Sequence, residues 1–190
     1  MVIYIHGFGG SGLGTKAKQA REMFKYEIVM APTLSTVPEL AVATLRELVD
    51  KFLKKGETVN LVGSSLGGYY ALYLADLFKI KAALVNPSVH PYETLKSQVG
   101  MVENFYDGSR FEWTERHLNM LRQFETTRPK CENFLLLLQK GDQVLNYREA
   151  MDKLPNSPVL LEEGGSHQFD DFPSKQPLIE AFFKGQPLPL

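Results

Sequence analysis

The chain has 190 residues, of which 44% are hydrophobic, and a formal net charge of −1. This length suits one domain with its own core, and the charge provides no attraction for nucleic acid or an anionic membrane. The single cysteine, Cys131, excludes an internal disulfide and a multi-thiolate zinc site. Because the chain opens on an apolar run without a charged leader, we expect a cytoplasmic protein with no nucleic-acid partner and no membrane insertion.

The first expected strand covers residues 2–6 and runs into a glycine-rich loop over residues 7–14. Gly7, Gly9 and Gly12 match the dinucleotide-binding pattern G-x-G-x-x-G, but the next strand ends in Ala31-Pro32 and offers no acidic residue at that end for a ribose hydroxyl. Residues 9–16 come close to a phosphate-binding loop, yet Thr15 and Lys16 stand in the reverse order. We therefore disfavour both nucleotide interpretations and expect no cofactor.

Strands and helices alternate along most of the chain. Expected strands are 2–6, 27–31, 58–62, 81–86, 133–139 and 158–162, and expected helices are 15–24, 36–55, 65–78, 93–99, 114–124, 147–154 and 174–183. Thr15 and Thr36 are expected to cap the first two helices. Because the apolar runs are continuous, we predict an α/β fold of about six mainly parallel strands with helices on both faces.

The turn after the third strand contains the pattern G-x-S-x-G at residues 63–67, with Ser65 at its centre. This pattern holds a serine on a strained strand-to-helix turn, where Gly63 and Gly67 let the two backbones pass closely. The Leu66 N–H would then point at an oxyanion formed beside Ser65. An ordinary loop that opens a helix is the alternative, so other residues must support the interpretation.

The loop after the first strand can supply a second oxyanion donor. In hydrolases with such a serine turn, this donor follows an early strand, often within a His-Gly-x sequence. His6-Gly7-Phe8 fits, which makes the Phe8 N–H the candidate. We expect His6 to be structural rather than catalytic, because a residue that ends a buried strand usually orients the loop after it.

The alternation stops after Pro87, and we expect a small cap insertion over residues 88–130 within a single domain spanning 1–190. Its aromatic residues, among them Phe105, Tyr106 and Trp113, could line an acyl pocket. For any one of them we favour the cap's own core.

A serine nucleophile needs a base to take its proton and a carboxylate to orient that base. Asp142 and His167 follow predicted strands, and together with Ser65 they give the chain order Ser, Asp, His of this fold. Asp170 and Asp171 are alternative acids, but neither follows a strand directly. No histidine or acidic pair has metal-ligand spacing, so we expect no metal site.

Five segments together resemble the small YqiA-like esterases of the α/β-hydrolase superfamily. They are IHGF at 5–8, GSSLGGYYA at 63–71, VNPSVHPYE at 85–93, GDQVLNYREA at 141–150 and EGGSHQF at 163–169. The resemblance implies a compact α/β-hydrolase fold and a serine esterase with its triad on Ser65, Asp142 and His167. Gln143 and Asn146 stand where acidic residues are expected, and His90 where a basic residue is expected, which bears on pocket charge and substrate preference.

We therefore expect a serine esterase that forms an acyl-enzyme and acts on a small-molecule acyl ester, or on a thioester such as acyl-CoA. Ser65, Asp142 and His167 would be catalytic, and Phe8 and Leu66 would form the oxyanion hole. The alternative is a noncatalytic ligand-binding protein on the same scaffold.

Overall fold

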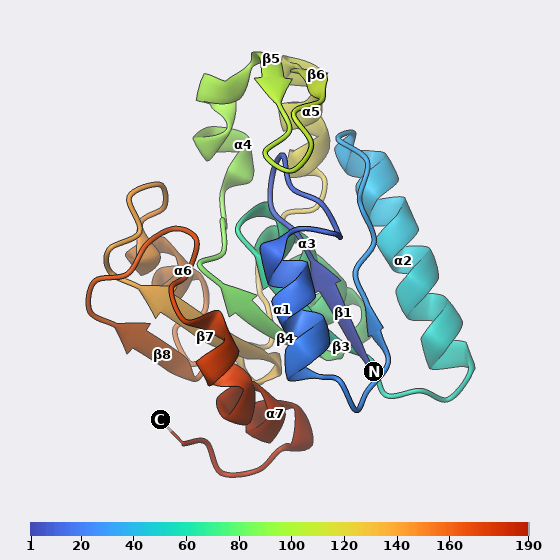
Figure 1. Cartoon of the computed structure of the whole chain (residues 1–190), viewed down its shortest axis with the longest axis vertical. Coiled ribbons are helices and arrows are strands. Elements are labelled where there is room, and N and C mark those ends of the chain that lie inside the picture. Colours follow the sequence, from blue (N-terminus) through green and yellow to red (C-terminus); the bar gives the residue numbers. More distant parts are fainter. Residues whose placement is uncertain (190) are drawn as a thin grey trace.

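The computed structural model describes residues 1–189, which form a parallel sheet covered by helices (Figure 1). Its six strands lie in the order β2-β1-β3-β4-β7-β8. They are β1 (Val2–Ile5), β2 (Val29–Met30), β3 (Asn60–Ser64), β4 (Lys81–Val85), β7 (Phe134–Gln139) and β8 (Val159–Glu162). Every neighbouring pair in this sheet is parallel, which confirms the predicted fold class.

Helices cover both faces of the sheet because strand side chains point alternately to opposite sides. On β1, Val2 and Tyr4 belong to the core on one face, whereas Ile3 and Ile5 belong to the core on the other. The first face packs under α1 (Thr15–Met23), η3 (Phe172–Lys175) and α7 (Gln176–Lys184). The second packs under α2 (Pro38–Lys54), α3 (Leu66–Phe78) and α6 (Tyr147–Lys153).

Residues 88–130, which we call the cap, lie above one end of the sheet (Figure 1). They contain α4 (Pro91–Thr94), η1 (Lys96–Gln98), β5 (Gly100–Glu103), β6 (Arg110–Trp113) and α5 (Glu115–Arg122), and η2 (Cys131–Asn133) then leads into β7. The expected helix 93–99 is wrong: α4 ends at Thr94, one 3₁₀ turn follows, and Gly100 at φ 127° begins an antiparallel hairpin of β5 and β6. Val99, at φ −58° and ψ 126°, is already extended, so helical structure ends before the last residue of the expected helix.

Several element boundaries also differ from the expected ones. Thr15 is the first residue of α1 and Gly14 precedes it as the cap, while Val37 rather than Thr36 caps α2. Neither cap position has a side-chain hydrogen bond. The strand expected over 27–31 is only Val29–Met30, the two residues that pair with Val2 and Ile3 of β1.

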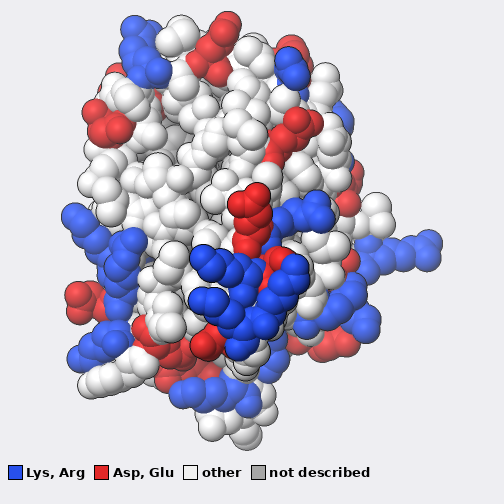
Figure 2. All heavy atoms as spheres, turned by 90° about the vertical axis from the view of Figure 1, so that its right-hand side faces the viewer, with Lys and Arg blue, Asp and Glu red and all other residues white. Residues whose placement is uncertain are grey.

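Charged side chains of both signs are interspersed on the face that looks out from the right-hand side of Figure 1 (Figure 2). Within residues 1–189, no helix combines the length and the apolar character needed to cross a bilayer.

Candidate active site

Ser65 lies on the turn between β3 and α3. Its backbone has φ 55° and ψ −121°, a conformation that residues with a side chain rarely adopt. Main-chain hydrogen bonds hold it there from two sides. The Ser65 N–H donates to Val85 O at 3.1 Å, and the Ser65 carbonyl accepts from Ser88 N at 3.0 Å. The surrounding backbone therefore fixes the serine at the carboxyl end of the sheet.

The glycines of the G-x-S-x-G turn are required by close backbone contacts, as the sequence predicted. A Cβ on Gly63 would clash with the Gly67 carbonyl, and a Cβ on Gly67 would clash with the Ile5 carbonyl of β1. Only hydrogen at these positions lets α3 start so close to the sheet.

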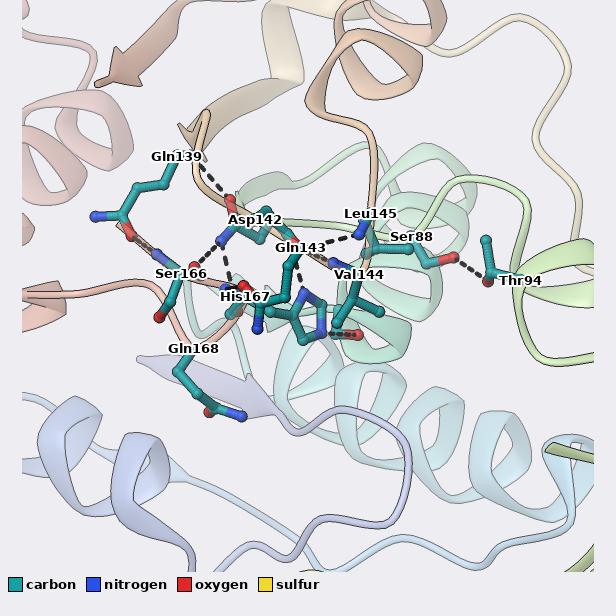
Figure 3. Close-up of polar contacts among 12 residues, drawn as sticks. Ser88, Thr94, Gln139, Asp142, Gln143, Val144, Leu145, Ser166, His167 and Gln168 are labelled. Atoms are coloured by element: carbon teal, nitrogen blue, oxygen red, sulfur yellow. Dashed lines mark hydrogen bonds and ion pairs between the residues drawn. The ribbon is translucent and has the colours of Figure 1, made fainter. Parts of the chain in front are cut away.

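Ser65, His167 and Asp142 form one hydrogen-bonded chain, although they come from three separate loops. His167 Nε2 lies 3.1 Å from Ser65 Oγ, and His167 Nδ1 lies 2.8 Å from Asp142 Oδ2. Figure 3 shows the Asp142 carboxylate turned toward the His167 ring. Because a carboxylate only accepts hydrogen bonds, Nδ1 carries the proton in this arrangement and the Nε2 lone pair faces the serine hydroxyl.

The Asp142 carboxylate is buried, and both of its oxygens accept hydrogen bonds from the protein. Its second oxygen accepts from Val144 N at 2.8 Å and from Leu145 N at 2.9 Å. Burial by itself would raise the pKa of Asp142, but the hydrogen bonds from His167, Leu145 and Val144 outweigh it and hold the pKa below its usual value. Asp142 is therefore ionised at neutral pH.

The alternative acids lie elsewhere. Asp170 Oδ1 accepts a hydrogen bond from Ser166 Oγ at 2.7 Å, Asp171 directly precedes η3, and both residues are exposed. Among the hydrogen bonds and ion pairs recorded for residues 1–189, the only carboxylate partner of the His167 ring is Asp142. The same part of the chain brings no three His, Cys, Asp or Glu side chains together as a metal site.

Two buried amides, which the sequence analysis missed, fix the loop that carries His167. Gln139 Oε1 accepts from Ser166 N at 3.1 Å and from Asp170 N at 2.8 Å. Asn86 Nδ2 donates to Ser166 O at 2.9 Å, and Asn86 Oδ1 accepts from Gln139 N at 3.0 Å. Both are only 3% exposed. The sequence signal that could have revealed these two amides is a polar residue at the end of each of two apolar strands.

His6 orients the peptide that joins Gly7 to Phe8. Its Nδ1 lies 2.8 Å from Gly7 O, and its Nε2 accepts from Leu34 N at 3.0 Å, so Nδ1 is the donor. Burial lowers the pKa of His6, which favours this neutral form. With both ring nitrogens bonded to the main chain, His6 has the structural role that the sequence predicted.

The candidate oxyanion donors are two main-chain N–H groups near Ser65. Gly7 O accepts from His6 and, at 3.2 Å, from Gly10 N. Because this peptide is trans, the Phe8 N–H points the opposite way from that carbonyl. Leu66 is the first residue of α3, where an N–H has no partner within the helix. Within residues 1–189, neither N–H has a recorded acceptor.

An open cleft of about 1010 Å³ contains the site and extends under the cap. Residues of its lining include Phe8, Ser65, Leu66, Phe105, Tyr106 and His167. Trp113 is 1% exposed and belongs to the core, as expected for a cap aromatic. That expectation is wrong for Phe105 and Tyr106, which are 79% and 46% exposed because they lie in the turn between β5 and β6.

Comparisons with known proteins agree with this architecture. The model of the family described as "Uncharacterised protein family (UPF0227)" matches residues 1–184. UPF0227 protein YcfP of Escherichia coli O9:H4 (strain HS) is 28% identical over 186 residues, which cover 96% of this chain and 98% of that protein.

Solved structures show the same fold at low sequence identity. One from Agrobacterium vitis S4 has a TM-score of 0.74 at 18% identity and covers 96% of this chain and 87% of its own. A monoacylglycerol lipase of Paleococcus ferrophilus has a TM-score of 0.69 at 15% identity and covers 96% and 93%. The chain thus has the α/β-hydrolase fold.

Proposed function

Because this chain belongs to the UPF0227 family, a family described without an activity, we propose its function from the geometry of the site. It is a serine hydrolase that cleaves carboxylic acyl esters, with acyl thioesters as a second substrate class. The observation that carries this proposal is the hydrogen-bonded chain from Ser65 Oγ through the His167 ring to the ionised Asp142 carboxylate. Such a chain activates a serine hydroxyl that is otherwise barely ionised at neutral pH.

In the first half of the reaction, Ser65 Oγ attacks the acyl carbonyl carbon while His167 Nε2 takes the hydroxyl proton. The carbonyl oxygen gains the negative charge and accepts hydrogen bonds from the Phe8 and Leu66 N–H groups. Asp142 stabilises the imidazolium. When the tetrahedral intermediate collapses, the bond to the leaving oxygen or sulfur breaks and His167 returns its proton to that atom.

In the second half, water replaces the leaving group. His167 removes a proton from water, the resulting oxygen attacks the acyl-enzyme, and the same two N–H groups stabilise the second tetrahedral intermediate. Cleavage of the ester to Ser65 releases the carboxylic acid, and the serine oxygen regains its proton from His167. Phe8, Leu66 and the triad residues therefore serve both halves without a cofactor.

The cleft has a mixed lining, with apolar surface for an acyl group beside many polar side chains. Phe105, Tyr106, Val144 and Leu145 contribute to its lining. Of the three positions that depart from the esterases which the sequence resembles, only Gln143 lines the cleft. Asn146 instead caps α6 by accepting from Arg148 N at 3.1 Å, and His90 Nδ1 lies 3.1 Å from Tyr92 Oη. The neutral Gln143 amide is thus the departure that bears on substrate preference.

The proposal is tested with p-nitrophenyl esters and the matching thioesters of increasing acyl length. Wild type, Ser65→Ala and Ser64→Ala are compared. We expect kcat/KM to fall by about five orders of magnitude in Ser65→Ala, as for the loss of a triad nucleophile, and by less than about tenfold in Ser64→Ala. Ser64 is the neighbouring buried serine and so controls for local packing.

Turnover that survives in Ser65→Ala would contradict the mechanism. If the folded wild type bound the esters without hydrolysing any, the noncatalytic ligand-binding alternative would replace it.

A further inference from the structure

The side chain of Phe8 is held by the cap, although its N–H belongs to the proposed oxyanion hole. Its ring lies 4.8 Å from the Trp113 ring at 74° and 5.6 Å from the Phe111 ring at 72°, centroid to centroid. Both partners are on β6. Trp113 in turn stacks on His117 of α5 at 4.9 Å, so Phe8 is inserted into an aromatic cluster that is anchored deep in the cap.

The turn of the same hairpin also binds the backbone of the loop. Phe105 N donates to Gly9 O at 2.8 Å, and Asn104 Nδ2 donates to Gly10 O at 3.3 Å. Gly9 has φ 61°, and a Cβ there would lie 3.0 Å from two carbons of the Phe105 ring. The hairpin therefore contacts three consecutive residues of the loop, Phe8 through its side chain and Gly9 and Gly10 through their carbonyls.

The loop of residues 7–10 is thus held from two directions. His6, directly after β1, fixes the carbonyl of Gly7 from the side of the sheet, while β6 and the hairpin turn hold the loop from the side of the cap. The peptide between Gly7 and Phe8 lies between these two attachments. A change in either one rotates or shifts the N–H that this peptide presents to Ser65.

We propose that the β5–β6 hairpin, through Phe111, Trp113 and Asn104, is a positioning element that orients the Phe8 N–H for oxyanion stabilisation. The inference rests on the proposed serine-hydrolase function. The hairpin supplies no reacting group and acts only through the loop of residues 7–10. Docking of the cap therefore affects the chemical step and not only access to the cleft.

Misalignment of the oxyanion donor can be distinguished from a change in pocket shape. A misaligned donor weakens binding of the transition state more than binding of the ester substrate. Removal of a whole oxyanion donor costs roughly 10²–10³-fold in kcat. For a donor that remains but is held less firmly, we expect a loss of about tenfold.

The variants Phe8→Ala and Phe111→Leu approach the same contact from its two sides. Phe8→Ala keeps the N–H and removes the ring that anchors it, whereas Phe111→Leu leaves the loop sequence intact. Met101→Ala is the matched control, because Met101 is on the same hairpin, is 58% exposed and does not line the cleft. Circular dichroism and thermal unfolding verify that each variant is folded.

We expect kcat to fall about tenfold in Phe8→Ala and Phe111→Leu with KM within about twofold, and to stay unchanged in Met101→Ala. A trifluoromethyl ketone with the acyl chain of the best substrate forms a charged tetrahedral adduct on a serine. Its Ki should rise in each variant by the factor by which kcat/KM falls. The double variant should lose little more than Phe8→Ala alone, because Phe8→Ala already removes the contact with Phe111.

Trp113 provides a direct optical signal, since it is the only tryptophan of the chain. Its fluorescence should change when the trifluoromethyl ketone binds wild type, and change less in Phe8→Ala, where the ring contact is absent. A merely structural role of the hairpin would not produce this difference.

The inference is overturned if wild type is active through Ser65 while Phe8→Ala and Phe111→Leu keep its kcat and Ki, or if they raise only KM. Failure of the proposed function looks different, because Ser65→Ala would then retain turnover or wild type would have none. If Phe111→Leu does not fold, Phe8→Ala decides the question alone, since it changes only a half-buried loop side chain.

Discussion

The loops at the end of the sheet and the cap contribute to the site in different ways. Each loop of the sheet presents one polar side chain that is fixed by main-chain or buried amide hydrogen bonds, as for Ser65, Asp142 and His167. The cap presents exposed aromatic residues, among them Phe105 and Tyr106, and no member of the hydrogen-bonded chain. The sheet thus sets how the three side chains face one another, while the cap lines the space around them and contacts the loop of residues 7–10.

Three contacts that join the cap to the sheet region lie away from Asp142 and His167. Contacts of the cap with the sheet side include the Tyr69 hydroxyl of α3, which donates to Leu121 O of α5 at 2.7 Å, the Ser88 N–H, which donates to Ser65 O, and the contact of the hairpin with the loop of residues 7–10. None of these three contacts involves Asp142 or His167. Changes in the cap should therefore alter rates moderately, whereas changes at the sheet end should abolish the proposed activity.

The largest effect that tests this comparison is expected for Asp142→Asn. An amide cannot stabilise the imidazolium and favours the wrong tautomer of His167, so kcat for a p-nitrophenyl ester should fall by about 10⁴-fold. Asp170→Asn, on the neighbouring loop, is the control and should change kcat by less than about tenfold. Steady-state assays of both variants decide between the two acids, and a greater loss in Asp170→Asn would contradict the assignment.

A smaller effect is expected for His6→Asn, which removes the sheet-side support of the Gly7 carbonyl. Because the shorter side chain cannot keep both contacts of His6, we expect kcat to fall about tenfold, as for the cap-side variants. His90→Asn in the cap does not touch the loop and should leave kcat unchanged. Equal rates for wild type and His6→Asn would show that the loop is held by the cap alone.

His6 also makes the sheet region sensitive to acid. Its pKa is lowered by burial, so below about pH 6.5 the unfolded chain binds a proton that the folded chain does not. The free energy of unfolding should therefore decrease as the pH falls below about 6.5. Urea unfolding between about pH 8 and pH 5 should show a shallower decrease for His6→Asn than for wild type. Identical slopes would contradict this role.

The smallest effect is expected for Lys16→Met at the edge of the cleft. Burial lowers the pKa of Lys16 to about 8, although the charge of Asp170 partly opposes this, so the charged ammonium costs stability at neutral pH. Lys16→Met should raise Tm at pH 7 by about 2 °C, measured by circular dichroism. The exposed Lys18→Met is the control and should not change Tm.

The pH dependence of the stability difference between wild type and Lys16→Met tests the sign of this effect a second time. Between pH values of about 8 and about 10.5, the unfolded chain keeps a proton on Lys16 that the folded chain has lost, so wild-type stability rises with pH. The advantage of Lys16→Met should shrink over this interval. An advantage that stays constant or grows would contradict the assignment.

The sequence predicted most of the sheet region because its constraints are local. The glycines at 63 and 67, the serine between them and the chain order of Ser65, Asp142 and His167 follow from short segments after apolar strands. The supporting amides were missed because their partners are distant in sequence; Asn86 binds Ser166, which is 80 residues away. No local pattern marks such a contact.

The cap was predicted less well for a related reason. The strands β5 and β6 have four residues each, with Met101, Glu103, Arg110 and Glu112 exposed, so the apolar alternation is too short to indicate a hairpin. What holds this hairpin in place is its contact with Phe8 and Gly9, almost one hundred residues earlier in the chain.

The central claim, that Ser65 is the nucleophile, is tested most directly by covalent labelling with a fluorophosphonate ester, followed by peptide mass spectrometry. The account predicts one phosphonyl group per chain on Ser65, formed together with the loss of ester hydrolysis, and none in Ser65→Ala. Labelling should be strongly slowed in His167→Ala, which lacks the base. An enzyme that hydrolyses esters while Ser65 stays unmodified, or that is inactivated by a label on another residue, would contradict the account.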